Sequence, residues 1–435
     1  MLTDSIRMGR FSMIGNEKLL VNSWQILKFS ECIKQLNTGL NPRNHFSLGH
    51  GSLKYITAKN LTQFGTIDFS KCDFVDEQAK RVIHRRSDIQ VGDILFSSRA
   101  PIGHCHLICE KPDDYDIGES IFSIRVNRKV ILPDYLCLYM ASDYFVRMAT
   151  LHTTGSIIQE IRIGDLMDTD VILPPMNVQR QIAECFKKID RKIALNNKVN
   201  DNLAQQAKLF YEYWFTQFDF PDENGKPYRT SGGQMQWTDT LKRNIPIGWR
   251  VVPFLEVASW ESNSQPPKRD FIYEPREGYI RFIQNRDYDS SAHKTYIPLT
   301  KSLSIVDRYD ILMDKYGDAG AVRYGIEGAF NVALGKINVH DKNHREYVRS
   351  FLASDSIYNY LHNSCMASTR ASLNESNLAM LNIAIPDEPV VAKYEELLRK
   401  MRDIILKNND ETAKLIELRD WLLPMLMNGQ ATISD

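Results

Sequence analysis

Residues 182–214 read IAECFKKIDRKIALNNKVNDNLAQQAKLFYEYW, a stretch in which mostly apolar residues recur at alternating steps of four and three positions. These positions are Ile182, Phe186, Ile189, Ile193, Asn196, Asn200, Leu203, Ala207, Phe210 and Trp214. The alternation is that of a coiled-coil seam, so it predicts one long helix whose apolar edge needs a partner helix. Roughly 40 helical residues span about 60 Å, which is too long for a helix that packs on one small domain.

A second copy of this pattern occupies residues 394–426. Its positions are Tyr394, Leu398, Met401, Ile405, Asn408, Thr412, Leu415, Arg419, Leu422 and Leu426. Both seams become polar at their middle, and antiparallel pairing would bring the two polar stretches together. A buried polar layer commonly fixes the register of a coiled coil at some cost in stability. The alternative interpretation is two ordinary amphipathic helices, each packed on its own domain.

The two helices are part of a repeat that covers the whole chain. Trp24 corresponds to Trp249, Asp93-Ile94-Leu95 to Asp310-Ile311-Leu312, and Ala141-Ser142-Asp143 to Ala353-Ser354-Asp355. Short apolar runs broken by Gly, Asp and Pro precede each helix and are typical of α+β domains. We therefore predict an α+β fold with a pseudo-twofold internal repeat. Its parts are a first domain (1–174), a first helix (175–215), a linker (216–244), a second domain (245–386) and a second helix (387–429), the helices forming an antiparallel coiled coil.

Composition narrows the class of protein further. A chain of 435 residues with 43% hydrophobic content exceeds what one core usually serves. Seven scattered cysteines, an odd number, favour reduced thiols, and no run of about 18 apolar residues occurs, so we expect a soluble cytoplasmic protein. His104, Cys105, His106 and Cys109 are close in sequence, but a strand would turn the histidines and cysteines to opposite sides, so we predict no metal site.

The segment between the halves carries the most specific motif. It contains Asp219-Phe-Pro221, Asn224-Gly-Lys-Pro-Tyr228, Ser231-Gly-Gly233 and Ile245-Pro-Ile-Gly-Trp249. Together with the order domain, helix, domain, helix, it closely resembles the specificity subunit of type I restriction-modification enzymes, over essentially the whole chain. Leu173-Pro174-Pro175 before the first helix is similar to that family as well. The second copy departs from it, with Pro386-Asp-Glu-Pro389 instead of a double proline.

The resemblance implies a function without a catalytic centre in this chain. Each α+β domain would be a target recognition domain that reads one half of a bipartite double-stranded DNA site, and the helices would set the gap between the halves. Two modification subunits would methylate adenine with S-adenosylmethionine, and two restriction subunits would translocate and cut DNA with ATP and Mg²⁺. We expect the modification subunits to cover an apolar stripe on the helices. Its residues are Phe186, Leu195, Phe210, Trp214 and Trp421.

Candidate DNA-binding residues are polar and basic side chains in predicted loops, since such groups contact phosphates and base edges. In the first half they are Arg43, Lys59, Asn60, Arg81, Arg85, Arg86, Ser98, Arg99, Thr154 and Ser156. In the second half they are Lys268, Arg269, Gln284, Asn285, Arg286, Lys315, Tyr316, Ser368, Thr369 and Arg370. Because a guanidinium binds guanine through two hydrogen bonds, Arg99 and Arg370 are the first choices for base contacts. A basic residue that is only a solvated surface charge is the alternative at each position.

No motif for catalysis stands out. The chain has no dinucleotide-binding or Walker glycine pattern and no Asn-Pro-Pro-aromatic string of an adenine methyltransferase. Asp310, Asp314 and Lys315 could suggest a nuclease site, but Asp314 corresponds to Ser97 in the first half, so this charge is not shared. Two other functions stay open: a methyltransferase or nuclease in its own right, and a coiled-coil scaffold that binds only protein.

Overall fold

The computed structural model describes residues 6–8, 24–42, 45–62, 65–150, 160–288, 294–366, 372–427 and 431–433. The chain divides into two compact units, Met1–Ile193 with Lys414–Asp435, and Ala194–Ala413. Each unit contains one α+β domain and a part of each long helix. None of the helices within the described ranges combines the length and apolar character needed to cross a membrane.

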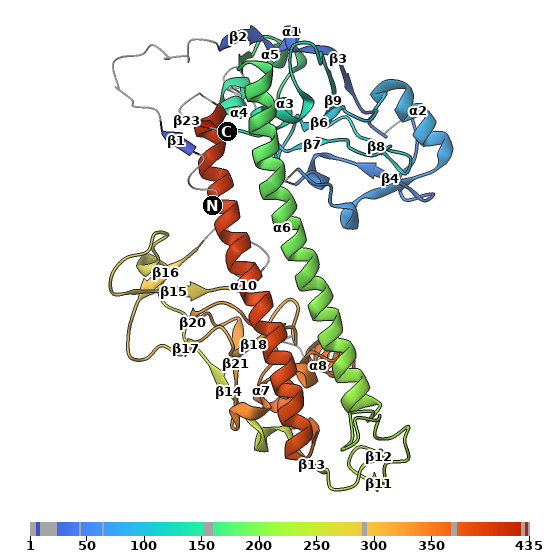
Figure 1. Cartoon of the computed structure of the whole chain (residues 1–435), viewed down its shortest axis with the longest axis vertical. Helices are drawn as coiled ribbons and strands as arrows, with labels where there is room; N and C mark the ends of the chain where they lie inside the picture. Colours follow the sequence, from blue (N-terminus) through green and yellow to red (C-terminus); the bar gives the residue numbers. More distant parts are fainter. Residues whose placement is uncertain are drawn as a thin grey trace. The chain divides into compact units, whose positions relative to one another are not determined.

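The two predicted long helices are α6 (Met176–Tyr211) and α10 (Glu388–Met427), drawn green and red in Figure 1. A short π-helical turn, Glu212–Thr216, follows α6. In the first unit, Ile182, Phe186 and Ile189 are buried in one core with Leu422 and Leu426. In the second unit, Trp214 lies 5.7 Å from the ring of Tyr394, near the start of α10. The helices therefore pair with each other instead of each covering its own domain alone.

The polar middle of the helix pair lies within the second unit. Asn196 is buried, and its Nδ2 donates to Glu411 Oε2 at 3.0 Å and to Thr412 Oγ1 at 3.3 Å. Asn200 Oδ1 accepts from Asn408 Nδ2 at 2.9 Å. Asn196 meets Thr412, whereas Asn200, one turn later in α6, meets Asn408, one turn earlier in α10. The helices therefore run antiparallel here, and the two polar stretches lie opposite each other. Other predicted interface positions are buried or half-buried: Ile193, Leu203, Leu398, Met401, Ile405 and Leu415.

The domain of the first unit is built on two sheets. A four-stranded antiparallel sheet has the order β3 (Ile33–Thr38), β9 (Ile121–Val126), β6 (Ile94–Ser97), β7 (Cys105–Leu107). A smaller sheet has the order β5 (Asp73–Val75), β4 (Leu53–Ile56), β8 (Tyr115–Ile117). Two pairs, β2 (Gln25–Lys28) with β10 (Asp170–Leu173) and β1 (Ile6–Met8) with β23 (Ala431–Ile433), complete the strands. Its helices are α1 (Phe29–Cys32), α2 (Glu77–Ser87), α3 (Pro133–Met140), α4 (Asp143–Thr150) and α5 (Ile163–Met167).

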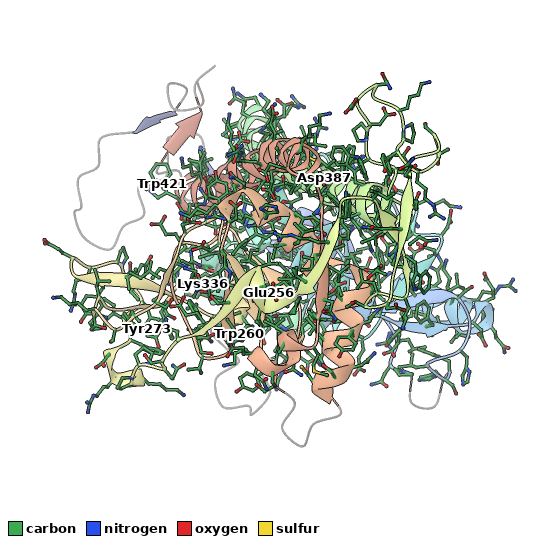
Figure 2. The ribbon with its side chains drawn as sticks, turned by 90° about the horizontal axis from the view of Figure 1, so that it is seen from below. Glu256, Trp260, Tyr273, Lys336, Asp387 and Trp421 are labelled. Carbon is green, nitrogen blue, oxygen red and sulfur yellow. The ribbon has the colours of Figure 1, made fainter. Side chains whose placement is uncertain are left out.

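The domain of the second unit follows the same plan. Its main sheet has the order β14 (Ala258–Ser262), β21 (Leu334–Val339), β18 (Ile311–Asp314), β19 (Val322–Arg323). The other four-stranded sheet is β16 (Tyr296–Pro298), β15 (Tyr279–Ile283), β20 (Gly328–Phe330), β17 (Ile305–Val306). The pair β13 (Arg250–Pro253) with β22 (Asn382–Ile385) corresponds to β2 with β10. Its helices are α7 (Arg345–Ala353), α8 (Asp355–Met366) and α9 (Glu375–Ala379). Two side chains of the main sheet, Trp260 on β14 and Lys336 on β21, are labelled in Figure 2.

Strand register supports the internal repeat residue by residue. In the first unit Ile94 pairs with Ile124, and in the second Ile311 pairs with Ile337. The same register places Asp314 where the first unit has Ser97. The repeat is interrupted after β5, however, because α2 follows β5 in the first unit. In residues 299–310, all of which the structure describes, no helix follows the corresponding strand β16.

The predicted linker is a folded element. Its hairpin pairs β11 (Met235–Thr238) with β12 (Arg243–Pro246). Phe220 stacks on Trp249 at 5.3 Å and on Tyr228 at 4.7 Å between ring centroids. The carboxylate of Asp219 accepts hydrogen bonds from the backbone N–H and the hydroxyl of Thr230 at 2.8 and 2.7 Å. The family-like motif therefore specifies an aromatic platform packed in the core of the second unit.

Buried charges join the second domain to α10 within the same unit. Glu346 lies between two buried arginines: it bonds Arg349 and accepts from Arg402 Nη2 at 3.1 Å. Both guanidinium groups lie over the ring of Tyr324, at 5.1 and 3.9 Å from its centroid. Glu395 on α10 accepts the backbone N–H of Tyr347 at 2.8 Å, at the start of α7. A charge buried in this cluster needs its partner, because an unpaired one would be strongly destabilising.

Glu395 makes the stability of the second unit depend on pH. Burial raises the pKa of its carboxyl to about 7, above the value of 4.5 expected in the unfolded chain. The folded state therefore holds the proton more tightly, and stability falls as pH rises from about 4.5 to about 7. We expect Glu395→Gln to stabilise the chain at pH 8 by at most about 3 kcal/mol, and the gain to vanish below about pH 5.

Urea unfolding of the full chain at pH 5 and pH 8 measures this effect. The matched control is Glu396→Gln, since Glu396 is exposed and pairs only with Lys400 on the next helical turn. We expect the control to show no such pH-dependent gain. A Glu395→Gln chain no more stable than the parent at pH 8 would contradict the prediction.

Candidate DNA-binding surface

The outer face of α2 borders a wide, open depression of about 670 Å³ in the first unit. The helix is amphipathic: Ala79, Ile83 and Ser87 are buried at steps of four, and its basic residues lie away from them. We name this surface the α2 depression. Its lining residues are Gln35, Asn37, Glu77, Lys80, Arg81, His84, Arg85, Arg86 and Asp88. The predicted residues Arg81, Arg85 and Arg86 are thus brought together on one surface.

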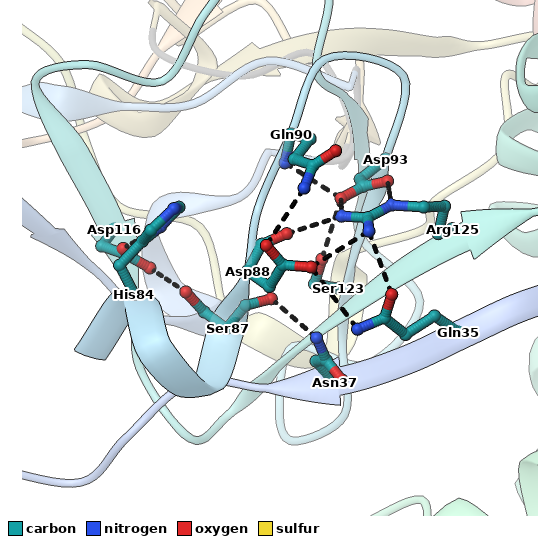
Figure 3. Close-up of polar contacts among 10 residues, drawn as sticks. All are labelled: Gln35, Asn37, His84, Ser87, Asp88, Gln90, Asp93, Asp116, Ser123 and Arg125. Atoms are coloured by element: carbon teal, nitrogen blue, oxygen red, sulfur yellow. Dashed lines mark hydrogen bonds and ion pairs between the residues drawn. The ribbon is translucent and has the colours of Figure 1, made fainter. Parts of the chain in front are cut away.

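Polar contacts beside the α2 depression join the end of α2 to the strands of the main sheet (Figure 3). Arg125 on β9 donates two hydrogen bonds to the carboxylate of the buried Asp93, from Nε at 2.9 Å and from Nη2 at 2.8 Å. Its Nη1 also donates to Asp88 Oδ2 and to Gln35 Oε1, each at 3.0 Å. Asn37 Nδ2 donates to the carbonyl of Ser87 at 3.2 Å. The hydrogen bond with Asp93 raises the pKa of Arg125, so the guanidinium is permanently charged and ties the end of α2 to the sheet.

A second buried carboxylate holds the helix from β8. Asp116 accepts from Ser87 Oγ at 2.6 Å, and its other oxygen lies 3.1 Å from His84 Nδ1 (Figure 3). Burial raises the pKa of Asp116. The serine hydroxyl donates to the carboxylate and not to the imidazole, so the three groups lack the relay that activates a serine nucleophile. Their role is to orient His84 on α2.

Three of the predicted residues in the first unit have partners inside the domain. Arg99 pairs with Glu119 at 2.7 Å and with Glu160 at 2.9 Å, so its charge is already neutralised. Ser98 is fully buried and its hydroxyl donates to the carbonyl of Ser120. Asn60 is also buried, and its amide donates to the carbonyl of Asp68. These three residues stabilise loops, whereas Lys59 beside them is exposed.

The candidates of the second unit lie in separate places. Lys268 and Arg269 are exposed on a short 3₁₀ turn. The side-chain amide of Asn285 donates to Asp314 at 2.9 Å, and that of Gln284 donates to Thr295 at 3.1 Å, so both side chains make hydrogen bonds within the domain. Arg286 is exposed.

Lys315 and Tyr316 follow β18. Lys315 Nζ is 6.0 Å from the centroid of the Trp260 ring, and Tyr316 is about half exposed. These two side chains stay candidates for contacts with DNA. Six further predicted residues lie outside the described part of the chain and stay predictions: Arg43, Thr154, Ser156, Ser368, Thr369 and Arg370.

Sequence reasoning missed the Asp93–Arg125 pair, although one signal was present. Asp93 and Asp310 occupy matched positions in the repeat, and in the second unit Asp310 pairs with Lys336 at 3.1 Å. An acid at the start of a central strand, paired with a cation from the neighbouring strand, is therefore common to both domains; Asp93 is buried and Asp310 is half-buried.

No group of three or more His, Cys, Asp or Glu residues within the described ranges is placed to hold a metal ion. The two histidines near the cysteines are bound elsewhere: His104 Nδ1 lies 2.6 Å from the carbonyl of Leu61, and His106 Nδ1 lies 2.6 Å from that of Gly65.

Comparison with known proteins agrees with the repeat. The family model of the type I restriction modification DNA specificity domain matches twice, at residues 48–205 and 246–412. The MjaIX specificity subunit of a type I restriction enzyme from Methanocaldococcus jannaschii is 24% identical over 404 residues, 88% of each chain. The HindI specificity subunit from Haemophilus influenzae is 22% identical over 419 residues, covering 81% of this chain and 88% of that one.

A solved structure shares the fold. It is the S subunit of a type I restriction-modification system from M. genitalium, which aligns over 94% of this chain and 98% of its own with a TM-score of 0.55 and 13% identity. Because the family model covers most of the chain in two copies, the chain belongs to the family of type I restriction-modification DNA specificity subunits.

Proposed function

We propose that this specificity subunit reads a bipartite double-stranded DNA sequence whose two halves differ. The observation that carries the proposal is that two domains share one strand plan but present different surfaces. The helix α2, which carries the exposed Arg81 and Arg85, has no counterpart in residues 299–310 of the second unit. Equivalent scaffolds with unlike side chains suit two readers of unlike half-sites.

The chain supplies recognition, and partner subunits supply the chemistry. Two modification subunits would bring S-adenosylmethionine and methylate adenine, and two restriction subunits would bring ATP and Mg²⁺, all in the cytoplasm. The length of the paired helices would set the gap between the half-sites. This assignment of roles extends what the family membership establishes.

Exposed apolar residues on the long helices support docking of the modification subunits. Phe186 and Trp214 of the expected stripe are buried inside the chain, so that part of the prediction was wrong. Leu195 is 54% exposed and Trp421, labelled in Figure 2, is 42% exposed. Single exposed apolar residues are ordinary, so these side chains mark positions at which docking of a modification subunit can be tested. Further exposed apolar side chains of α6, α10 and the turn after α6 are Leu209, Tyr213 and Ile404.

The test compares the purified chain with its assembled complex. The chain alone, given S-adenosylmethionine and DNA, should transfer no methyl groups. Assembled with its modification subunits, it should direct methylation of adenines in one bipartite sequence, which mapping of methylated host DNA would reveal. Turnover by the single chain would favour the alternative of an enzyme. An assembled complex without sequence-dependent methylation or DNA binding would favour a protein-only scaffold.

A further inference from the structure

We propose that α2 of the first recognition domain binds the phosphate backbone of double-stranded DNA through Arg81 and Arg85, and that it reads no bases. This inference rests on the proposed function, because it presumes that the first domain binds DNA. It assigns to one helix the contact that positions the domain, and it leaves sequence reading to the loops.

Arg81 and Arg85 differ from the other cations of the α2 depression. They lie four residues apart on α2, so their side chains leave the same face of the helix. Both are exposed, and neither makes a hydrogen bond or an ion pair with any residue in the described part of the chain. By contrast, Lys80 donates to the carbonyl of Asp113, and Arg86 Nε donates to Thr38 Oγ1 at 3.1 Å. The guanidinium groups of Arg81 and Arg85 are therefore available to bind an external anion.

The surroundings favour a phosphate over a base edge. Reading a base needs donors and acceptors held in a fixed pattern, whereas a phosphate needs only positive charge within reach. The carboxamides of the depression, Gln35 and Asn37, each already make a hydrogen bond inside the domain, which restricts the atoms that they could offer to a base. Of the two carboxylates that line the surface, Asp88 is bonded to Arg125, a guanidinium that it shares with Asp93. The other, Glu77, begins the helix and would keep an anion away from that end.

Polar contacts at the C-terminal end of α2 hold the helix in place. Arg125 joins Asp88, at the end of α2, to Asp93, and Asp116 holds Ser87 and His84. A helix anchored at its C-terminal turn presents Arg81 and Arg85 without a further ordering cost for the backbone. Because residues 299–310 contain no corresponding helix, the first half-site should carry more of the salt dependence of binding than the second.

The experiment measures the affinity of the assembled complex with its modification subunits for DNA between 50 and 200 mM KCl. Each phosphate contact contributes a slope of about −0.9 to log K against log salt. The variant Arg81→Gln/Arg85→Gln should reduce the steepness of this slope by about 1.8. The salt dependence over this range should then be about tenfold smaller than for the parent. Affinity should fall by the same factor for cognate DNA and for DNA with a scrambled first half-site, and the methylated sequence should not change.

The matched control is Lys34→Gln/Lys129→Gln, which removes the same charge from other exposed positions of the same domain. Its slope should equal that of the parent. An equal loss in the control would show an effect of net charge and overturn the proposal. So would loss of discrimination at the first half-site in the arginine variant, which would mean that α2 reads bases. If the parent complex itself bound DNA without salt dependence, this result would contradict the proposed function, whatever the behaviour of the α2 variant.

Discussion

Exchanging residues 24–173 for the corresponding domain of another family member should change one half of the methylated sequence and leave the other half and the gap unchanged. The chain enters and leaves this domain at one place, because Gln25 pairs with Leu173 across β2 and β10. The strands of the main sheet all lie between these two residues. Two neighbouring cut points therefore transfer all strands of the main sheet together, while the core of this unit also contains residues of α6 and α10.

The exchange succeeds only if the incoming domain fits the helices. Gln179 of α6 is buried, and its carbonyl oxygen accepts the backbone N–H of Leu132 at 2.9 Å, while its nitrogen donates to Pro174. The incoming domain must therefore supply a backbone donor and an apolar face for Ile182 and Phe186.

Mapping methylated adenines in cells that carry the hybrid with its modification subunits gives the result directly. The matched control exchanges residues 250–385, the equivalent segment between β13 and β22, and should alter the other half-site only. A single exchange that altered both half-sites would contradict independent readers.

Lengthening both long helices by one heptad should lengthen the gap between the half-sites and weaken binding. One heptad beside Asn196 and one beside Asn408 keep both seams in phase, since a seam repeats every seven residues. Seven residues add about 10 Å of helix. Along a duplex that rises about 3.4 Å per base pair, this is an upper limit of about three base pairs.

The added base pairs also turn the second half-site around the helix axis. About three base pairs correspond to a quarter of a turn or more, at about 10 to 10.5 base pairs per turn. The complex must then strain or twist the DNA, so we expect reduced affinity with both half-sites unchanged.

The control inserts the heptad in α6 alone. It leaves seven residues without a partner and shifts the polar layer, in which Asn196 meets Glu411 and Thr412, so binding to every spacing should fall. If the doubly lengthened subunit still directed methylation only at the original spacing, the helices would not set the gap, and the modification subunits would have to do so.

The long helices and the repeat could be predicted from the sequence because their signals are local and periodic. The four-three spacing from Ile182 to Trp214 depends only on which residues a helix places on one side. The polar positions Asn196 and Asn408 interrupt the two seams at matching points, which already indicated antiparallel pairing. Asp93 and Asp310 occupy matched positions for the same reason, since duplicated strands keep their order and register.

Which basic residues have a carboxylate partner was decided only by the tertiary structure. Arg99 was the first choice by sequence, yet Glu119 and Glu160, both distant in sequence, neutralise it. Arg81 and Arg85 have no such partners in the described part of the chain, although their local sequence is no more distinctive. Whether a charge is available depends on which carboxylates the fold brings within about 4 Å of it. Those carboxylates come from other strands and loops, so a pattern of neighbouring residues along the chain carries no record of them.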